Sequence, residues 1–291
     1  MLFDQIAERI ESTIKMRRLA VLMTVHNRKE RTVHCLDCLF DCLVPNCYSF
    51  DVFITDDGCT DGTADVVRNL YPDVNIVHGD GNLYWNRGMW VAWNVAAKGN
   101  YDFYLWLNDD TYLYPIALEE LISESVSHDD KAIIVGTTEN SEKTAITYGG
   151  YVGGERQTPQ GNSIEVEYFN GNVVLIPRYV YEKLGNLDYY FRHSKGDFDY
   201  GMRAKETGIK MYQVDEFLGI CEHHTVMGDW CNPDLPLKKR WNSLYLPNSV
   251  RPNEVFYLNF KHFGIVNAVF HYISVYTRCL FPSLWIKKGK L

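Results

Sequence analysis

Three short clusters of polar residues stand where a run of apolar residues ends. They are His26-Asn27-Arg28, Asp56-Asp57-Gly58 and Asn108-Asp109-Asp110. Neighbouring carboxylates raise each other's pKa unless they are solvated or neutralised. A divalent cation held by one or two carboxylates together with substrate phosphates meets that requirement. The 108–110 cluster therefore indicates a site for Mg²⁺ or Mn²⁺ and a phosphorylated ligand.

Both acidic clusters also have a purely structural interpretation. Asp110 or Thr111 can cap the helix expected after Pro115. Residues 56–62 have the composition of an Asx-type turn that leads into a capped helix. Acids at the carboxyl end of a strand can equally accept hydrogen bonds from ribose hydroxyls or from a base N–H. For residues 56–62 the turn and the ligand contact are compatible.

The three clusters need a scaffold that brings strand ends together. Four apolar runs of strand length alternate with three segments of helical period in the first 110 residues. We expect the strands at residues 19–25, 48–57, 73–79 and 101–110, and the helices at residues 26–43, 60–71 and 85–99. Such alternation gives a mostly parallel sheet covered on both faces, with the ligand beyond the carboxyl ends of the strands. The clusters should converge there.

The rest of the chain is less regular and is expected to continue the same sheet. We predict a helix at residues 116–126, strands at residues 132–138 and 172–177 with a Gly-rich turn region between them, and a separate helix at residues 2–16. The predicted architecture is α/β with a C-terminal helical extension. Its parts are a domain at residues 1–237, with halves at residues 19–114 and 115–237, and the extension at residues 238–291.

Charge is distributed unevenly along the 291 residues. The net charge is −8, which argues against nucleic-acid binding through a basic surface. Residues 238–291 carry nine Lys and Arg and one acid, Glu254, so this segment is +8 and residues 1–237 are −16. The basic segment is also rich in aromatic residues. It has the composition of a surface for anionic lipid headgroups, or of a helical cap on the domain.

Location is predicted from two further features of the sequence. The N-terminus has acids where a signal peptide needs a basic and then an apolar region, so we expect a cytoplasmic protein whose eight cysteines are reduced. The longest stretch without a charged residue, His262–Thr277, has 16 residues, too few for a transmembrane helix. Attachment to the inner face of the cell membrane would therefore be peripheral.

Five motifs in order resemble one enzyme family. HNR after the first strand, DDGCTDGT, GNLYWNRGM, LNDDT and GDFDYGMRAKETG are similar in order and spacing to motifs of the family 2 inverting glycosyltransferases, which have the GT-A (Rossmann-like) fold. The resemblance runs from Leu19 to about residue 224. LNDDT is most similar to the LNPDT motif of the rhamnosyltransferase-like branch.

The resemblance implies that residues 1–237 are a catalytic domain, with a nucleotide-binding half (19–114) and an acceptor and base half (115–237), and it implies roles for individual positions. The donor nucleotide would be contacted by Val25, Asn27, Asp56, Asp57, Asn82, Arg87 and Asp109. The cation would be held by Asp110 and a histidine, with His224 preferred to His223, and the sugar and acceptor would meet Trp85, Asn170, Gly171 and Asn172. Loop capping is an equal account of the two asparagines. Ordinary surface or partly buried positions are an equal account of the histidines.

Asp197 matches the family's catalytic base, which removes the proton of the acceptor hydroxyl. One base and a single displacement invert the anomeric centre, and a cation neutralises the diphosphate leaving group. A helix-start acid stabilised by the helix dipole is the structural alternative. Gly196 stands where the family commonly has Glu, so Asp197 lacks an acidic neighbour.

The resemblance implies an inverting, cation-dependent transferase that moves a sugar from a nucleotide-sugar to a hydroxyl of a glycan or lipid-linked acceptor, in cell-surface polysaccharide synthesis. A nucleotidyltransferase that makes a sugar nucleotide is one alternative, although HNRKER lacks the glycines that such enzymes place after the first strand. A non-catalytic glycan-binding protein is the other. The sequence leaves the donor sugar, its base, the linkage and the oligomeric state open.

Overall fold

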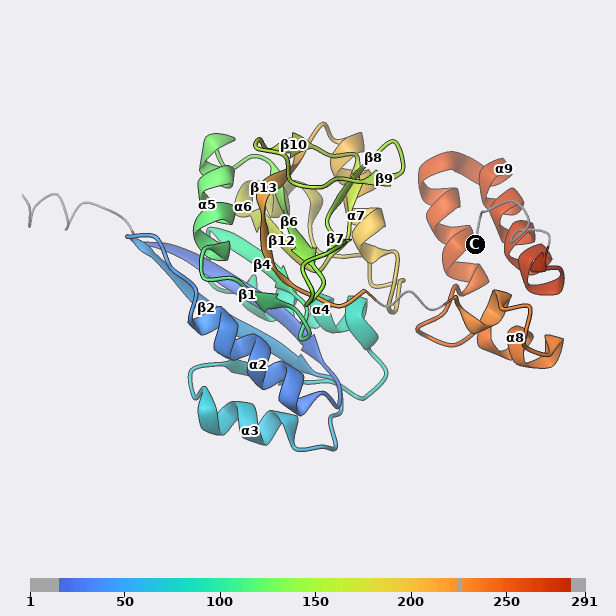
Figure 1. Ribbon diagram of the computed structural model, residues 1–291, viewed down its shortest axis with the longest axis horizontal. Helices are drawn as coiled ribbons and strands as arrows, with labels where there is room; N and C mark the ends of the chain where they lie inside the picture. The colour runs from blue at the N-terminus through green and yellow to red at the C-terminus, as the bar shows by residue number, and fades with distance from the viewer. Residues whose placement is uncertain (1–15, 224–226, 284–291) are drawn as a thin grey trace, which may run out of the picture.

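The computed structural model describes residues 16–223 and 227–283. The helix expected at residues 2–16 falls, apart from Met16, outside this range. Within the described part, one large sheet has the strand order β10-β13-β6-β12-β4-β1-β2-β3, with β5 and β7 paired at its margin, and β11-β8-β9 form a small second sheet. Figure 1 shows the helices around the large sheet and a helical C-terminal segment at one side.

The strands of the large sheet are β1 (Arg17–Val25), β2 (Tyr48–Asp56), β3 (Asn75–His78), β4 (Phe103–Leu107), β5 (Tyr112–Leu113), β6 (Ile133–Glu139), β7 (Ile146–Tyr148), β10 (Ile164–Glu165), β12 (Val173–Pro177) and β13 (Met211–Ile220). The small sheet contains β8 (Gly150–Val152), β9 (Glu155–Arg156) and β11 (Tyr168–Phe169). The helices are α2 (Lys29–Phe40), α3 (Thr63–Leu70), α4 (Tyr84–Ala96), α5 (Ala117–Ser127), α6 (Arg178–Leu184), α7 (Gly196–Glu206), α8 (Leu237–Ser243) and α9 (Pro252–Leu280), with a 3-10 turn at Asp229–Cys231.

Alternate residues of the strands bury two separate cores. On one face, Val21 and Met23 of β1 pack with α2, α3 and α5. On the other face, Ala20 and Leu22 pack with α4, α6 and α7. Side chains of a strand point alternately to its two faces, so a strand buried on both faces is apolar throughout. The α/β class and the covered sheet predicted from the sequence are confirmed.

Strand direction brings distant segments to one edge of the sheet. β1 is parallel to β2 and β4, so residues 26–28, 57 and 108–110 all leave the sheet at its carboxyl edge. β12 is antiparallel to β4, and its first residue therefore lies at that same edge. The Asn108 N–H donates to the Asn172 carbonyl at 3.1 Å. The loop before β12 thereby joins the three acidic and polar clusters.

The C-terminal segment is helical, as predicted, and reverses direction at Gly264. This residue has non-helical angles (φ 80°, ψ 177°) inside α9, so α9 forms a hairpin of two helical halves, which we call the C-terminal hairpin (residues 252–280). The rings of Phe256 and Tyr272 pack edge to face between the halves, with their centroids 5.8 Å apart. Among the described residues, no helix has both the length and the apolar character needed to cross a membrane.

Candidate active site

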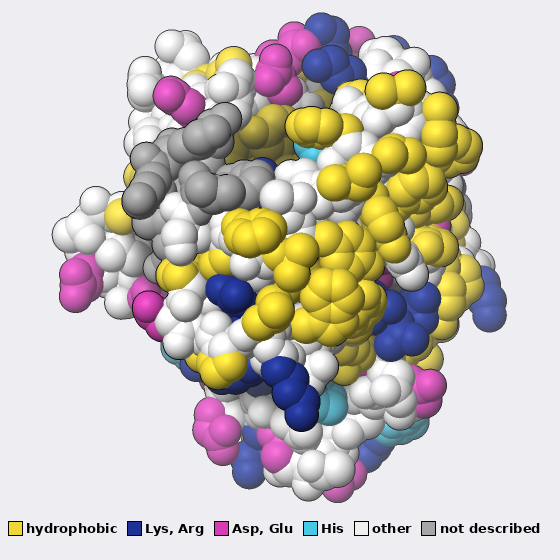
Figure 2. Space-filling model, turned by 90° about the vertical axis from the view of Figure 1, so that its right-hand side faces the viewer, with side chains coloured by type: hydrophobic (Ala, Val, Ile, Leu, Met, Phe, Trp, Pro, Cys, Tyr) yellow, Lys and Arg dark blue, Asp and Glu magenta, His cyan; other side chains and the backbone are white. Residues whose placement is uncertain are grey.

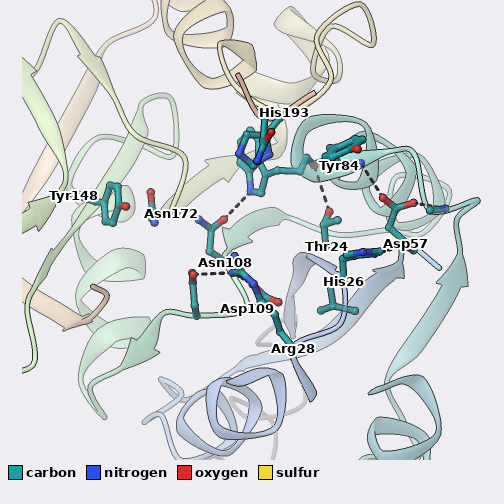
Figure 3. Close-up of a pocket in the computed structure, with 15 residues that line it drawn as sticks. Thr24, His26, Arg28, Asp57, Tyr84, Asn108, Asp109, Tyr148, Asn172 and His193 are labelled. Carbon is teal, nitrogen blue, oxygen red and sulfur yellow. Dashed lines mark hydrogen bonds and ion pairs between the residues drawn. The ribbon is translucent and has the colours of Figure 1, made fainter. Parts of the chain in front are cut away.

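Two adjoining cavities open at the carboxyl edge of the sheet. The first cavity, of about 460 Å³, is lined by Thr24, Val25, His26, Arg28, Asp57, Gly81, Tyr84, Trp85, Asn108, Asp109, Asp110, Tyr148, Asn172, His193 and Asn248. The second cavity, of about 250 Å³, is lined by Trp85, Asn108, Tyr148, Asn170, Gly171, Asn172, His193, Ser194, Lys195, Asp197 and Phe198. Five residues line both, so a ligand in one cavity borders a ligand in the other. Figure 3 shows the first cavity, with Asp57 and Tyr84 on one side and Tyr148 and Asn172 on the other.

Asp57 sits beneath the start of α4 and is nearly fully buried. Its Oδ1 accepts hydrogen bonds from the N–H groups of Gly81 and Leu83 at 2.9 and 3.2 Å. Its Oδ2 accepts from Leu83 and Tyr84 at 3.0 and 2.9 Å. These N–H groups have no acceptor within the helix, and a carboxylate at a helix N-terminus satisfies both them and the helix dipole. Asp57 therefore fixes the wall of the first cavity from β2 to α4.

Asp56, Asn27 and Asn82 lie near the first cavity but do not line it. Asp56 accepts from the N–H of Cys59 at 2.9 Å and contacts Nδ1 of His78 at 3.1 Å. Asn27, with φ at +50°, accepts from the Thr60 N–H at 2.7 Å. The N–H of Asn82 donates to Asp80 at 2.9 Å. These contacts shape the turns that follow β1, β2 and β3.

Asp109 and Asp110 face one another across a single guanidinium. Nη1 of Arg28 lies 3.1 Å from Oδ1 of Asp109 and 2.8 Å from Oδ2 of Asp110. Burial raises the pKa of Asp109 to about 7, while Arg28 lowers it. Because one cationic atom reaches both carboxylates, the two acids form a single site for positive charge in the first cavity.

Trp85, Asn108 and Gly171 form the boundary between the two cavities. The indole Nε1 of Trp85 donates to Oδ1 of Asn108 at 2.6 Å. A Cβ at Gly171 would lie 2.7 Å from the Trp85 ring and 3.3 Å from Cβ of Asp197. Only glycine lets this backbone pass between them. Asn170, which lines the second cavity, accepts from the Tyr151 hydroxyl at 3.0 Å.

Asp197 is the carboxylate of the second cavity. It lies in the first turn of α7, and its side chain accepts from the Gly171 N–H at 3.1 Å and the Phe198 N–H at 2.9 Å. Burial raises the pKa of Asp197 to about 6, although these hydrogen bonds and the nearby Lys195 lower it. A carboxylate with this pKa is ionised at neutral pH and still basic enough to accept a proton.

The structure adds residues to the site that the motifs did not identify. Tyr148 and His193 line both cavities, Lys195 lines the second and Asn248 lines the first. Burial lowers the pKa values of His193 and Lys195. The positions of His193 and Lys195 just before Asp197 were a usable signal. Asn248 belongs to the C-terminal extension and had none.

The 188–199 segment, which carries Asp197, is held on one side by α4. The side-chain amide of Asn86 donates to the carbonyls of Asp188 and Phe191 at 2.9 and 2.8 Å. Arg87 donates from Nε to the Tyr189 carbonyl at 2.9 Å and places its guanidinium over the Tyr189 ring. Arg87, expected beside the nucleotide, therefore lines neither cavity in this structure.

The same segment is held on its other side by the C-terminal hairpin. Glu254 is almost fully buried and accepts from the Arg192 N–H at 3.3 Å. Its carboxylate lies 3.0 Å from Nε of Arg251 and 3.8 Å from Nζ of Lys195. The Tyr257 hydroxyl and the Lys261 ammonium both donate to Asp188, at 2.9 and 2.8 Å.

Asp199 joins α7 to the hairpin. Its side chain is fully buried and pairs with Arg203 one turn along α7 at 2.9 Å. Its other oxygen contacts Lys261 at 2.7 Å and Nε2 of His262 at 2.9 Å. Breaking such a buried pair leaves an uncompensated charge and is strongly destabilising. The first turn of α7, with Asp197, is thereby fixed to a helix more than 50 residues away in sequence.

Gly196 has a physical reason in its surroundings. A Cβ at this position would lie 1.6 Å from Oδ1 of Asn86, the residue that holds the 188–199 segment. Glu, common here in the family, cannot enter unless Asn86 moves. At this position α4 and α7 pack closely, and Asp197 has no acidic neighbour.

The histidine expected at the cation is not placed. His224 lies outside the described residues. His223 is close to Nη2 of Arg156, at 3.4 Å, and to the ring of Tyr148. Among residues 16–223 and 227–283, no group of three or more His, Cys, Asp or Glu side chains converges as a metal site. Of the residues expected to hold the cation or to support it, Asp109 and Asp110 line the first cavity.

Comparison with known proteins places this geometry in a family. The model described as Glycosyl transferase family 2 matches residues 20–185. The comparison with curated proteins found no match. Among solved structures, S. aureus TarS superimposes with a TM-score of 0.55 at 15% identity, covering 89% of this chain and 49% of that one. The chain thus spans about half the length of that TarS chain.

A shorter TarS structure gives fuller coverage. TarS 1–349 in complex with UDP-GlcNAc superimposes with a TM-score of 0.57 at 13% identity, covering 94% of this chain and 93% of that one. At such identity the likeness shows a shared GT-A fold. The family model, however, matches more than half of the 291 residues, from β1 to the end of α6. The chain belongs to glycosyl transferase family 2.

Proposed function

We propose that this chain is an inverting, cation-dependent glycosyltransferase that moves a sugar from a nucleotide-sugar to a hydroxyl of a glycan or lipid-linked acceptor. One observation carries the proposal. Paired acids line the first cavity, a single acid lines the second, and five residues line both. A donor in the first cavity would present its sugar at the border with the second. The family match and a structural neighbour crystallised with UDP-GlcNAc support this reading.

The first cavity suits a nucleotide diphosphate and a divalent cation. Asp109 and Asp110 already share one cationic group, Nη1 of Arg28, and Mg²⁺ or Mn²⁺ is commonly held by two carboxylates with substrate phosphates. Arg28 is partly exposed and can turn toward the phosphates. A bound cation would neutralise charge that develops on the diphosphate leaving group. Val25 and Asp57 would form the wall behind the nucleoside.

Asp197 would act on the acceptor. Its carboxylate faces the second cavity, where it can accept the proton of the acceptor hydroxyl as the oxygen attacks the anomeric carbon. The N–H groups of Gly171 and Phe198 hold the carboxylate in place. Asn170, Asn172 and Trp85 would contact the sugar and the acceptor. One base and one displacement give inversion.

The test is donor hydrolysis across a panel of nucleotide-sugars, with Mn²⁺, with Mg²⁺ and with EDTA. We expect one donor to be hydrolysed with a cation and not with EDTA. Asp110→Ala should abolish that activity, while Asp65→Ala, which removes an exposed acid of α3, should retain it. Hydrolysis that survives both EDTA and Asp110→Ala would contradict the role of the cation. The biological setting that we propose, synthesis of cell-surface polysaccharide in the cytoplasm, depends on which donor is found.

A further inference from the structure

The C-terminal hairpin has two unlike faces. Its inner face makes polar contacts with residues 188–206. The residues that make them are Glu254, Tyr257, Lys261 and His262. A small core of Leu244, Val275 and Cys279 joins the second half of the hairpin to α8. The inner face therefore has polar partners and the base of the hairpin has an apolar core.

The outer face of the hairpin and the adjoining α8 is apolar and exposed. Val266 is 82% exposed and Phe270 67%. The other exposed large apolar side chains of this region are Leu237, Trp241, Tyr245, Leu246, Phe260, Phe263, Ile265, Val269, Ile273, Leu280 and Phe281. Figure 2 shows hydrophobic side chains gathered in a broad patch on this side, with Lys and Arg side chains at several points of its margin. Monomeric soluble proteins rarely expose contiguous apolar patches of this kind, which mark interaction sites.

The positive charge of residues 238–291 favours a partner with negative charge. The region that bears the patch is +8 in a chain that is otherwise −16. Arg251 and Lys261 are paired on the inner side, with Glu254 and with Asp188 and Asp199. Lys238 and Lys239 at the start of α8 are exposed, and Lys239 lies 3.6 Å from Asp229. Pairing two copies through this face would bring these lysines of one copy toward those of the other. A bilayer with anionic headgroups offers opposite charge at its surface and an apolar interior beneath.

We propose that the outer face of the C-terminal hairpin lies in the interfacial layer of a membrane that contains anionic lipids. No described helix can span, so the hairpin would lie along the surface with Val266 and Phe270 among the acyl chains. Lysines at the margin would meet the headgroups. None of the exposed apolar residues of this surface lines either cavity. The inference also favours a lipid-linked acceptor over a soluble glycan. This last point rests on the proposed function.

The inner contacts would couple the membrane to the reaction. The hairpin half that holds the 188–199 segment continues directly into the exposed turn at Gly264. A membrane-bound hairpin would therefore present the second cavity at a fixed height above the lipid. That arrangement suits an acceptor whose hydroxyl is tethered to a membrane.

The test is co-sedimentation of the full chain with phosphatidylcholine vesicles, with and without phosphatidylglycerol. We expect binding to the anionic vesicles, weakened when salt rises from about 0.1 M to about 1 M, because the Debye length falls from about 10 Å to about 3 Å. The double variant Val266→Asp, Phe270→Asp should bind at least about tenfold more weakly, because it loses two apolar side chains that would be buried among the acyl chains of the membrane.

Matched variants separate the surface from general effects of charge. Leu43→Asp, Leu70→Asp replaces two side chains that are 55% and 56% exposed on the α2–α3 side, and should bind vesicles as the wild type does. All variants should keep the circular dichroism spectrum and the melting temperature of the wild type, which shows that they fold. Failure of the wild type to bind anionic vesicles would overturn the inference, as would equal binding by the hairpin variant. If the wild type does not bind vesicles but forms an oligomer, and the hairpin variant is monomeric, the face would instead be an interface with a second copy. None of these outcomes depends on whether sugar is transferred.

Discussion

The carboxylates of the first cavity and the carboxylate of the second are held in different ways. Asp57 is fixed by N–H groups 24 to 27 residues further along the chain, between the end of β3 and the start of α4. Asp109 and Asp110 follow β4 directly. Asp197, by contrast, lies on a segment clamped between α4 and the C-terminal hairpin, through Asn86 on one side and Glu254 on the other.

Because the two cavities are held by different contacts, a substitution can change one cavity more than the other. Apart from His193 and Asn248, the first cavity is lined by residues of the sheet, its turns and the start of α4, so changes in the hairpin should affect donor binding less than transfer. The second cavity depends on contacts made across the domain, and a base displaced by about 1 Å can cost about 100-fold in rate. Changes in the hairpin should therefore lower transfer more than donor affinity.

The largest effect is expected from Asp197→Asn. It removes the proton acceptor and preserves the size of the side chain. We expect kcat for transfer to fall by about 10²- to 10⁴-fold, the usual contribution of a general base, while the donor Kd from calorimetry stays close to that of the wild type. A variant that transfers at the wild-type rate would remove Asp197 from the mechanism.

Glu254→Gln should show that the hairpin matters to the base. The amide can still accept from the Arg192 N–H, but Lys195 and Arg251 lose their shared counter-charge. We expect kcat to fall by about 10- to 100-fold through displacement of Asp197, with a donor Kd changed by no more than about threefold. Glu119→Gln, on the exposed start of α5, is the matched control and should have no effect. Equal losses of donor affinity and kcat would contradict the separation of the two halves.

Asp57→Asn alters the first cavity and leaves the contacts of the second cavity in place. An amide NH₂ would face backbone N–H groups where Oδ1 or Oδ2 now accepts, and an unsatisfied buried group costs about 1–3 kcal/mol. We expect the start of α4 to loosen and the donor Kd to rise by about tenfold. The rate of transfer from the saturated complex should change less. A normal donor Kd would show that this wall does not shape donor binding.

The smallest effect is a change with pH. The pKa of Asp197 is raised to about 6, and only the ionised carboxylate accepts a proton. Transfer should therefore fall by about half between pH 7 and pH 6, by about fivefold between pH 6 and pH 5, and by about tenfold for each pH unit below that. At a saturating concentration of Mn²⁺, which keeps Asp109 ionised, Asp197→Asn should lack this limb in its residual rate. A wild-type profile that is flat down to pH 5 would contradict the assignment.

The first half of the molecule was largely predictable from the sequence, because its signals are local. The apolar runs predicted β1, β2 and β4 to within a few residues, and the acids that follow β4 reach the first cavity. Arg87 and Asn82 line neither cavity, because Arg87 contacts Tyr189 and Asn82 contacts Asp80. Their contacts with the nucleotide stay predictions.

The second half was less predictable, because its geometry depends on distant pairings. Nothing near Asn172 states that β12 runs antiparallel to β4, and this direction brings the 170–172 loop to the site. In the sequence, Glu254 is distinguished only as the single acid of a basic segment. Its partners Lys195 and Arg192 are about 60 residues away. A pattern of charges does not reveal such a pairing without the fold.

The central claim is that Asp197 serves a single displacement at the border of the two cavities. The most direct measurement is the anomeric configuration of the sugar released or transferred from the accepted donor, followed by NMR before mutarotation. We predict that the first product has the configuration opposite to that of the donor. Retention of configuration would require a second displacement and would contradict the account.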